Sequence, residues 1–273
     1  MYILDASKIQ SLSSYLQSQG WLEKGDEIRE VSKPGEGNMN CVLRVTSNDK
    51  SIIIKQSRGY VEKYPQIPAP QNRVLVEGAL YKRTRVNEVI KQHMPALLGM
   101  DPINNILALE DLGHASDYTH LYGMRTKLTA NEIKSLAVYL TNLHHSFYKE
   151  NLDDEFQNIE MRTLNHQHIF AYPFMEDNGF NLDNVQDGLQ EVAGPYKSDN
   201  ELKDIILNVG KLYLSKGHYL LHGDFYPGSW LKGENGLKII DPELCFYGPV
   251  EFDLRVMIAH LIRTRHEDHV IEN

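Results

Sequence analysis

The chain has 273 residues, of which 41% are hydrophobic and 24% charged, and its formal net charge is −9. This length and composition predict a soluble globular protein with one large domain or two lobes and ample material for a core. The acidic balance argues against a nucleic-acid-binding protein and against a basic membrane-surface protein. No apolar run reaches membrane-spanning length.

Cysteine and histidine usage indicates neither a disulfide scaffold nor a zinc site. Cys41 and Cys245 lie far apart in the sequence, which fits a reducing compartment. The first residues lack the basic flank and apolar run of a signal peptide, so we expect a cytoplasmic protein. His144 and His145 fall in a helical pattern, and we interpret them as packing residues rather than ligands.

The chain begins with a predicted helix and an antiparallel meander. Residues 5–20 carry apolar side chains at helical spacing and end at a glycine. Strand-like runs follow at residues 27–33, 38–46 and 51–56, joined by short turns. Consecutive strands with short connections predict an antiparallel sheet.

The next segments complete this sheet-rich part. Residues 60–73 contain three prolines and predict a loop, and a long helix is expected from about residue 72 to residue 92. Two further strands are expected at residues 96–100 and 106–109.

The first turn of the meander, residues 34–40 (PGEGNMN), is a candidate phosphate-binding loop. Glycine and asparagine allow backbone N–H groups to approach a phosphate closely, whereas a flexible hairpin turn is the alternative. The candidate residues are Gly35, Gly37, Asn38 and Asn40.

Lys55 follows an apolar run and is expected in the interior, where it could pair with nucleotide phosphates. An edge-strand lysine facing solvent is the alternative. Glu77 lies early in the long helix, where an acid can brace such a lysine, although the helix dipole alone also favours an early glutamate.

Glu110, Asp111 and Leu112 end the last strand and are expected to form a hinge. An extended hinge offers backbone groups to an adenine edge, so these three residues are candidate nucleotide contacts. The alternative is the simple start of a loop.

The rest of the chain is mainly helical in pattern. A capping box at residues 129–132 opens one helix, and further helices are expected at residues 201–216 and from residue 252. Residues 153–198, rich in Asn, Asp and Gly, are expected to be irregular.

Two strand ends near the C-terminus each deliver a carboxylate. Asp224 follows one apolar run and Asp241 another, and the polar turn at residues 232–236 lies between them. Strands joined by such a turn form a hairpin, which predicts that the two carboxylates lie close together. One acid can act on the proton of a hydroxyl and the other can hold Mg²⁺, as phosphoryl transfer requires.

These motifs together resemble the aminoglycoside-phosphotransferase-type kinases, a branch of the protein-kinase-like fold that acts on small molecules. The string HGD at residues 222–224 followed by Ser229 is similar to one subgroup, the methylthioribose kinases. The string DPELCFYGP at 241–249, followed by FD at 252–253, closely resembles the next motif of that subgroup. Further similarities are the strings GNMN at 37–40, KQ at 55–56, HIF at 168–170 and PF at 173–174.

The resemblance implies a role for each matching residue. Asp224 would be the catalytic base that orients the acceptor hydroxyl or accepts its proton. Asp241 and Glu243 would hold Mg²⁺, and Ser229 occupies the place of a further metal ligand. Asp253 would brace the catalytic loop through its backbone. The nucleotide implied is ATP.

The chain departs from the subgroup around the acceptor. Tyr226 and Pro227 replace a His-Thr pair beside Asp224, so acceptor selection is expected to depend on Tyr226. Glu251 and Arg255 stand where the subgroup has small residues.

The subgroup also continues beyond Asn273 with helices whose arginines contact the sugar. The acceptor site is therefore built differently, or the chain is a piece of a longer one, or catalysis is impaired. We expect weak activity on methylthioribose compared with some other hydroxyl compound, or activity only in a longer form of the chain. Among the arginines near the end of the sequence, Arg255 could point either to the cleft or to solvent, whereas Arg263 and Arg265 are expected to be solvated.

The predicted fold class is α+β, a two-lobed protein-kinase-like fold. Residues 1–112 would form the nucleotide-binding lobe, an antiparallel sheet plus a helix, and residues 113–273 a mainly helical catalytic and acceptor lobe with the catalytic hairpin. The implied function is an ATP- and Mg²⁺-dependent kinase of methylthioribose or a related sugar. A kinase of an amino alcohol or aminoglycoside and a pseudokinase are the alternatives. The expected partner is a small-molecule hydroxyl substrate, with neither nucleic acid nor membrane, and a homodimer stays open.

Overall fold

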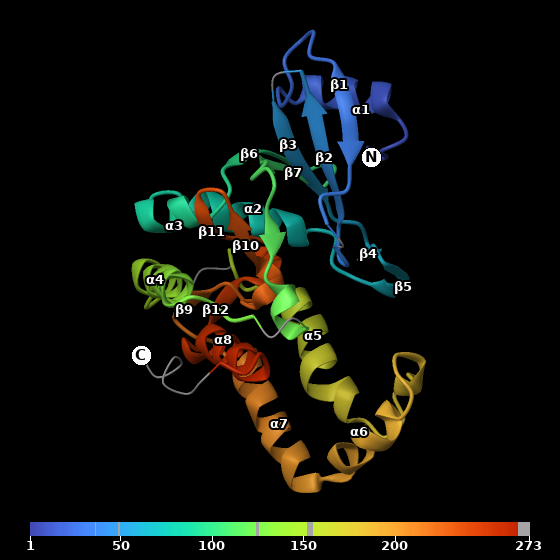
Figure 1. Ribbon diagram of the computed structural model, residues 1–273, viewed down its shortest axis with the longest axis vertical. Coiled ribbons are helices and arrows are strands. Elements are labelled where there is room, and N and C mark those ends of the chain that lie inside the picture. Colours follow the sequence, from blue (N-terminus) through green and yellow to red (C-terminus); the bar gives the residue numbers. More distant parts are fainter. Residues whose placement is uncertain (36, 49, 124–125, 152–154, 267–273) are drawn as a thin grey trace.

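The computed structural model describes residues 1–35, 37–48, 50–123, 126–151 and 155–266. A sheet-rich N-terminal part lies above a mainly helical C-terminal part in Figure 1. The α+β, two-lobed architecture expected from the sequence is therefore confirmed.

An antiparallel sheet in the order β1-β2-β3-β7-β6 forms the N-terminal part. Strand β3 is central, hydrogen-bonded to β2 on one side and β7 on the other. The strands are β1 (Ile28–Ser32), β2 (Cys41–Ser47), β3 (Ser51–Gln56), β6 (Leu97–Asp101) and β7 (Ile106–Glu110).

The helices are α1 (Ile9–Ser18), α2 (Arg73–Thr84), α3 (Glu88–His93), α4 (Ala130–Ser146), α5 (Ile159–His166), α6 (Leu189–Ser198), α7 (Asn200–Leu214) and α8 (Glu251–Arg263). The remaining strands are β4 (Tyr60–Val61), β5 (Tyr64–Pro68), β8 (Ser116–Asp117), β9 (Tyr219–Leu221), β10 (Trp230–Gly233), β11 (Gly236–Ile239) and β12 (Phe246–Gly248). Among the described residues, no helix is long and apolar enough to cross a lipid bilayer.

Side chains along β3 alternate between the two faces of the sheet, and each face packs against a different hydrophobic core. Successive residues of a strand point to opposite faces. Ile52 and Ile54 join the core that includes α1 residues, whereas Ile53 packs against the core that includes α2. Lys55, two residues after Ile53, shares that second face and is 5% exposed. The alternation therefore directs Lys55 toward α2.

The larger hydrophobic core joins the two parts. It combines residues of α2, α3 and β7 with residues of α4, β9, β10, β11 and α8. Helix α2 thus lies between the sheet and the C-terminal part (Figure 1). The division at residue 112 stays a prediction, and residues 267–273 of the predicted second lobe lie outside the described residues.

The loop expected at residues 60–73 is wrong in its first half, because β4 and β5 form a small antiparallel hairpin there. Backbone N–H groups of Glu62 and Lys63 donate to the carbonyls of Met39 and Asn38 at 3.2 and 3.0 Å. The hairpin therefore forms where the preceding loop supplies hydrogen-bond acceptors.

The single helix expected at residues 72–92 is also wrong, because it is broken into α2 and α3. Asn87 has extended backbone angles, and its side-chain oxygen accepts from the N–H groups of Val89 and Ile90. An asparagine in this geometry is a strong N-cap, so it starts a new helix.

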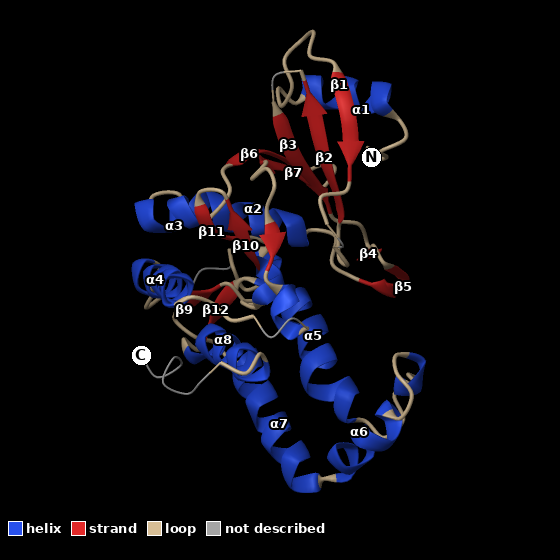
Figure 2. Cartoon of the chain, in the orientation of Figure 1, coloured by secondary structure: helices blue, strands red, loops and turns tan. Residues whose placement is uncertain are grey.

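Residues 159–198 contain helices rather than the irregular structure expected for this region. Helices α5, α6 and α7 form an arm that projects from the body of the protein, with α6 at its far end (Figure 2). At the base of the arm, buried Arg162 donates to the carbonyls of Tyr213 and Ser215 at 2.7 and 2.8 Å. The expectation of irregular structure is therefore wrong for α5 and α6.

Candidate functional site

A hairpin forms at the predicted polar turn, but its first strand is β10, which follows Asp224, and the expected pairing of the strand before Asp224 is wrong because that strand, β9, pairs with β12. Strands β10 and β11 pair antiparallel, with Trp230 opposite Ile239 and Gly233 opposite Gly236. Asp241 follows β11 directly, and the N–H of Ile240 donates to the Ser229 carbonyl at 3.0 Å. The hairpin therefore fixes the Asp241 segment against the catalytic loop.

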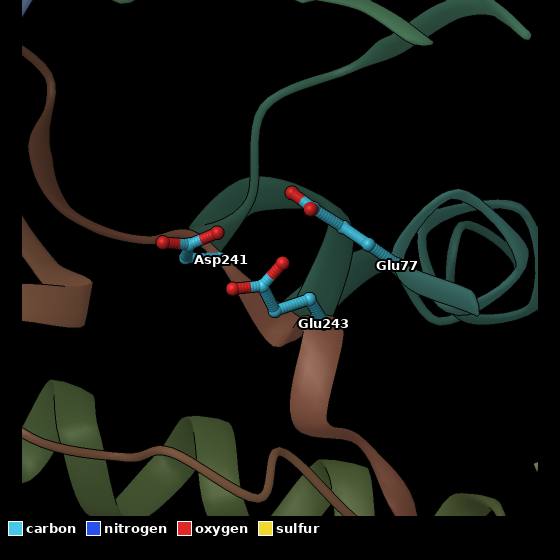
Figure 3. Close-up of side chains that lie close together, drawn as sticks. All are labelled: Glu77, Asp241 and Glu243. Carbon is cyan, nitrogen blue, oxygen red and sulfur yellow. The ribbon is translucent and has the colours of Figure 1, made fainter. Parts of the chain in front are cut away.

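Three carboxylates converge beside this hairpin. Glu77 comes from α2, and Asp241 and Glu243 come from the segment after β11 (Figure 3). Their candidate ligand oxygens all lie within 4.8 Å of one another. Asp241 takes the left-handed conformation, with φ 69°, which Asp tolerates better than most residues. This bend in the backbone brings the carboxylates of both Asp241 and Glu243 close to Glu77.

Lys55 bridges two members of this group. Its ammonium lies 2.5 Å from Glu77 Oε2 and also contacts the Asp241 carboxylate. Burial alone would lower the pKa of Lys55, but the charges of Asp241, Glu77 and Glu243 outweigh it and raise the pKa. The predicted pairing of the strand lysine with Glu77 is confirmed, and the alternative of a solvent-facing edge lysine is wrong.

A second layer of polar side chains surrounds Glu243, which is 4% exposed. Asn40 Nδ2 donates to Glu243 Oε2 at 2.6 Å, and Arg73 Nε lies 3.5 Å from the same oxygen. Burial is the main cause that raises the pKa of Glu243, and the Asn40 hydrogen bond and the Lys55 and Arg73 charges oppose it. Glu243, a candidate metal ligand, is therefore held in place by Asn40 and Arg73, which come from two distant segments of the chain.

Sequence reasoning missed Arg73, which is fully buried. Its guanidinium donates to backbone carbonyls of the glycine loop and of the segment around β4 and β5. A basic residue in the first turn of a helix opposes the helix dipole. This unfavourable position is the feature of the sequence that could have identified Arg73 as a buried, paired residue. The acceptors are the carbonyls of Met39, Arg58, Tyr60 and Pro70, at 2.6 to 3.1 Å.

The candidate phosphate loop is tied down at its C-terminal end. The Asn38 carbonyl is bound by the Lys63 N–H, and the Asn40 side chain faces Glu243. Gly35 and Gly37 have space around them that a Cβ would not overfill, and residue 36 lies outside the described residues. Contacts of Gly35, Gly37, Asn38 and Asn40 with a nucleotide stay predictions.

The side chains of Asp111 and Glu110 hold the hinge segment in place. The Asp111 carboxylate accepts from Arg44 Nε and Nη2 at 2.8 and 2.9 Å and from the Ser51 hydroxyl at 2.5 Å. Glu110 pairs with Ala96 through both its backbone N–H and its carboxylate. Contacts of Glu110, Asp111 and Leu112 with an adenine edge stay predictions.

The predicted brace of the catalytic loop by Asp253 is confirmed. Its fully buried carboxylate accepts from the N–H groups of His222 and Gly223 at 2.7 and 3.0 Å and from His144 Nε2 at 3.0 Å. Burial opposes ionisation, but these hydrogen bonds and the neighbouring histidines lower the pKa of Asp253. Gly223 has φ +84°, and a Cβ there would lie 2.1 Å from the Leu244 carbonyl oxygen.

The buried side chains of His222 and Ser229 stabilise the catalytic loop through hydrogen bonds. Burial lowers the pKa of His222, so its neutral ring donates from Nε2 to the Ile240 carbonyl at 3.1 Å, and Nδ1 accepts from the Asp224 N–H at 3.4 Å. The Ser229 hydroxyl donates to the Asp224 carbonyl at 2.8 Å. Ser229 thus supports the loop, and its role as a metal ligand stays a prediction.

Asp224 has the electrostatics of a group that can exchange a proton near neutral pH. Burial, followed by the negative charges of Asp241, Glu243 and Asp253, raises its pKa to about 8. Near physiological pH a group with such a pKa is present in both protonated and ionised forms, and the ionised form can accept the proton of a hydroxyl. Its neighbour Tyr226 is half-buried, with its ring 5.7 Å from the His260 ring.

Comparison with known proteins finds related sequences and a shared fold. The chain is 27% identical over 253 residues to the methylthioribose kinase of Exiguobacterium sibiricum, covering 90% of this chain and 64% of that protein. It is 26% identical over 240 residues to the methylthioribose kinase of Bacillus pumilus, covering 83% of this chain and 58% of that protein. The chain thus spans about three fifths of the length of these relatives. No protein-family model matches it.

Solved structures of small-molecule kinases share the fold. LicA, a choline kinase from Streptococcus pneumoniae, superposes in its AMP complex with a TM-score of 0.56 at 14% identity, over 98% of this chain and 78% of that one. A spectinomycin phosphotransferase in complex with ADP and spectinomycin superposes with a TM-score of 0.52 at 18% identity, over 96% and 77%. The fold is therefore the two-lobed protein-kinase-like one.

Proposed function

We propose that this chain is an ATP-dependent phosphotransferase that phosphorylates a hydroxyl group of a sugar-like small molecule. The observation that carries the proposal is the buried Lys55–Glu77 pair beside Asp241 and Glu243. This set of groups suits the binding of a nucleotide and a divalent cation. Similarity to methylthioribose kinases supports a sugar-like acceptor.

The carboxylates fit Mg²⁺, which prefers hard oxygen ligands. Asp241 and Glu243 would hold the ion, and Glu77 would stay with Lys55. Within the described residues, Asn40 Oδ1 is a buried oxygen without a hydrogen-bond partner near Glu243, which a metal-bound water would satisfy. When bound, Mg²⁺ would neutralise charge on the phosphate oxygens.

The chain's own residues would supply positioning and charge. Lys55, oriented by Glu77, would place its ammonium on the nucleotide phosphates once Asp241 turns to the cation. Asp224 would orient the acceptor hydroxyl and accept its proton, with the loop held by Asp253. Such a site accelerates transfer by holding the reactants in line and by stabilising developing charge.

Calorimetric titration of ADP and ATP, with and without Mg²⁺, tests the nucleotide part. We expect binding that is tighter with Mg²⁺, and no binding in either condition would refute the proposal and also the pseudokinase alternative that keeps nucleotide binding.

An ADP-release assay over methylthioribose, other sugars, choline and aminoglycosides tests the acceptor, with Asp224→Ala as the inactive control. Turnover of choline or an aminoglycoside alone would support the amino-alcohol or aminoglycoside alternative. Nucleotide binding without any acceptor turnover would support a pseudokinase.

We place the enzyme in the cytoplasm, where ATP is abundant and where unpaired cysteines such as Cys41 and Cys245 are stable. Self-association into a homodimer stays a prediction, and light scattering at several concentrations would test it.

A further inference from the structure

Four side chains form a connected cluster beside the catalytic loop. The Tyr226 N–H donates to the Asp224 carbonyl at 3.2 Å, and the Tyr226 ring lies 5.7 Å from the His260 ring. The Tyr122 hydroxyl lies 2.7 Å from His260 Nδ1. The Arg263 guanidinium covers the Tyr122 ring at 4.9 Å. We call Tyr122, Tyr226, His260 and Arg263 the Tyr-His-Arg cluster.

Backbone contacts hold the segments that carry Tyr122 and Tyr226. The short helix Thr119–Tyr122 is anchored because the Tyr118 N–H donates to the Pro227 carbonyl at 3.0 Å. Strand β8, just before it, pairs with β10 of the catalytic hairpin. Gly228 makes room for Tyr226, because a Cβ at this position would lie 2.4 Å from the Tyr226 hydroxyl oxygen.

The cluster is not part of a hydrophobic core. Tyr122 is 38% exposed, Arg263 is exposed, and Tyr226 and His260 are half-buried. Burial raises the pKa of both phenols; at Tyr122 the Arg263 charge opposes this shift, and at both residues the Asp224 charge adds to it. A partly exposed group of rings beside the catalytic acid is therefore placed to meet the acceptor.

We propose that the Tyr-His-Arg cluster is the acceptor-binding surface and that it selects an uncharged polyhydroxyl compound over a cationic amine. This inference rests on the proposed phosphotransferase function. It assigns Tyr122, His260 and Arg263 to the acceptor in addition to Tyr226.

The hydrogen-bonding chemistry of the cluster suits a sugar. Burial, followed by the Arg263 charge, lowers the pKa of His260. The ring is therefore neutral, and its Nδ1 accepts a hydrogen bond from the Tyr122 hydroxyl. The Tyr122 oxygen then keeps its lone pairs for the hydroxyl of a ligand. The ring of Tyr226 offers an apolar face to the C–H groups of a sugar.

The charges of the cluster disfavour a cation. Aromatic rings often bind quaternary ammonium groups through their faces, but here Arg263 already covers the Tyr122 face. The Asp117 Oδ1 accepts from the Thr119 N–H at 2.9 Å and from the Thr119 hydroxyl, and the negative charges of Asp117 and Asp224 lie on the Tyr226 side of the cluster, so discrimination against a cation depends on Arg263. A cationic acceptor would therefore meet a fixed positive charge and an already occupied ring.

Steady-state kinetics with methylthioribose and choline test the inference, together with ADP–Mg²⁺ binding by calorimetry. Tyr122→Phe keeps the ring and removes the hydroxyl, so KM for the sugar should rise about fivefold. Arg263→Glu reverses the charge, and the ratio of kcat/KM for choline to that for the sugar should rise about tenfold. Arg265→Gln, at a neighbouring exposed arginine, is the matched control. ADP–Mg²⁺ affinity should stay unchanged in all three variants.

The outcomes separate the inference from the function on which it rests. A wild-type protein that phosphorylates the sugar, with Tyr122→Phe and Arg263→Glu unchanged within twofold, overturns the inference and leaves the proposed function standing. A wild-type preference for choline also overturns it. A wild-type protein that phosphorylates no compound of the full acceptor panel removes the proposed function, and the inference is then refuted with it.

Discussion

The side-chain amide of Asn40 donates to the carboxylate of Glu243 across 2.6 Å, although 203 positions separate the two residues in the chain. Asn40 ends the glycine-rich loop, and Glu243 belongs to the carboxylate group of the C-terminal part. Both side chains are buried, at 5% and 4% exposure. The loop proposed to hold phosphate and the acid proposed to hold Mg²⁺ are therefore physically joined.

We expect Asn40→Ala to weaken Mg²⁺-dependent ADP binding about tenfold, as is typical when a residue that supports a metal ligand is removed. Asn40→Asp should be worse, because it places a carboxylate against Glu243. Calorimetry with and without Mg²⁺ measures both, and exposed Asn131→Ala is the control. Equal losses with and without Mg²⁺ would contradict a role through Glu243.

The two aspartates of the hairpin region should fail in different ways. Asp224→Ala should lower kcat by about a thousandfold and leave ADP–Mg²⁺ affinity nearly intact, because the acid acts on the acceptor hydroxyl. Asp241→Ala should instead lose the Mg²⁺-dependent part of nucleotide binding. Parallel kinetics and calorimetry check this division, and identical behaviour of the two variants would refute it.

Replacing Asp224 should also stabilise the protein at alkaline pH. Its pKa is about 8 in the folded protein and about 3.9 in an unfolded chain. Between these values the folded state binds more protons, so the free energy of unfolding falls as pH rises through this window. Asp224→Asn cannot ionise and escapes the loss, which predicts a gain of about 1–3 kcal/mol at pH 8 and a much smaller gain at pH 5.

Urea denaturation in EDTA at the two pH values measures this gain, with exposed Asp187→Asn as the control. A gain of the same size at both pH values would show that ionisation of Asp224 is not its source.

Two glycines with positive φ should differ sharply in their tolerance of alanine. Gly223 (φ +84°) would place a Cβ 2.1 Å from the Leu244 carbonyl oxygen, whereas Gly236 (φ +100°) has open space around it. Gly236→Ala should cost about 1 kcal/mol through backbone conformation alone. Gly223→Ala should cost about 3 kcal/mol or more because the loop must also move. Thermal and urea denaturation of both variants compare them, and similar losses would show that the Leu244 contact relaxes freely.

Local patterns in the sequence were sufficient for several elements and for the central chemistry. The apolar run at residues 51–56 predicted β3, and the polar turn at residues 232–236 predicted the hairpin that β10 and β11 form. Both signals depend on neighbours within a few residues, where periodicity and turn chemistry act. The match of residues 222–224 and 241–243 to known kinases then pointed to the carboxylates.

Segments shaped by distant hydrogen-bond partners, or by a cap inside an apolar pattern, were predicted poorly. The β4–β5 hairpin depends on carbonyls of Met39 and Asn38, and Asn87 divides one expected helix into two. Arg162 supports the arm through carbonyls at the end of α7. The partners of the β4–β5 hairpin and of Arg162 lie far along the chain, whereas Asn87 is a local cap that interrupts an apolar pattern otherwise typical of one helix.

The sequence by itself determined which residues could do the chemistry: a lysine after an apolar strand, a helix glutamate, and the acids around one hairpin. Only the tertiary structure decided that Arg73 and Asn40 converge on Glu243 and that His144 donates to Asp253. The physical reason is that a buried polar group is stable only with a partner. In this protein those partners lie far along the chain, and the packing of α2 and α4 against the C-terminal strands brings them together.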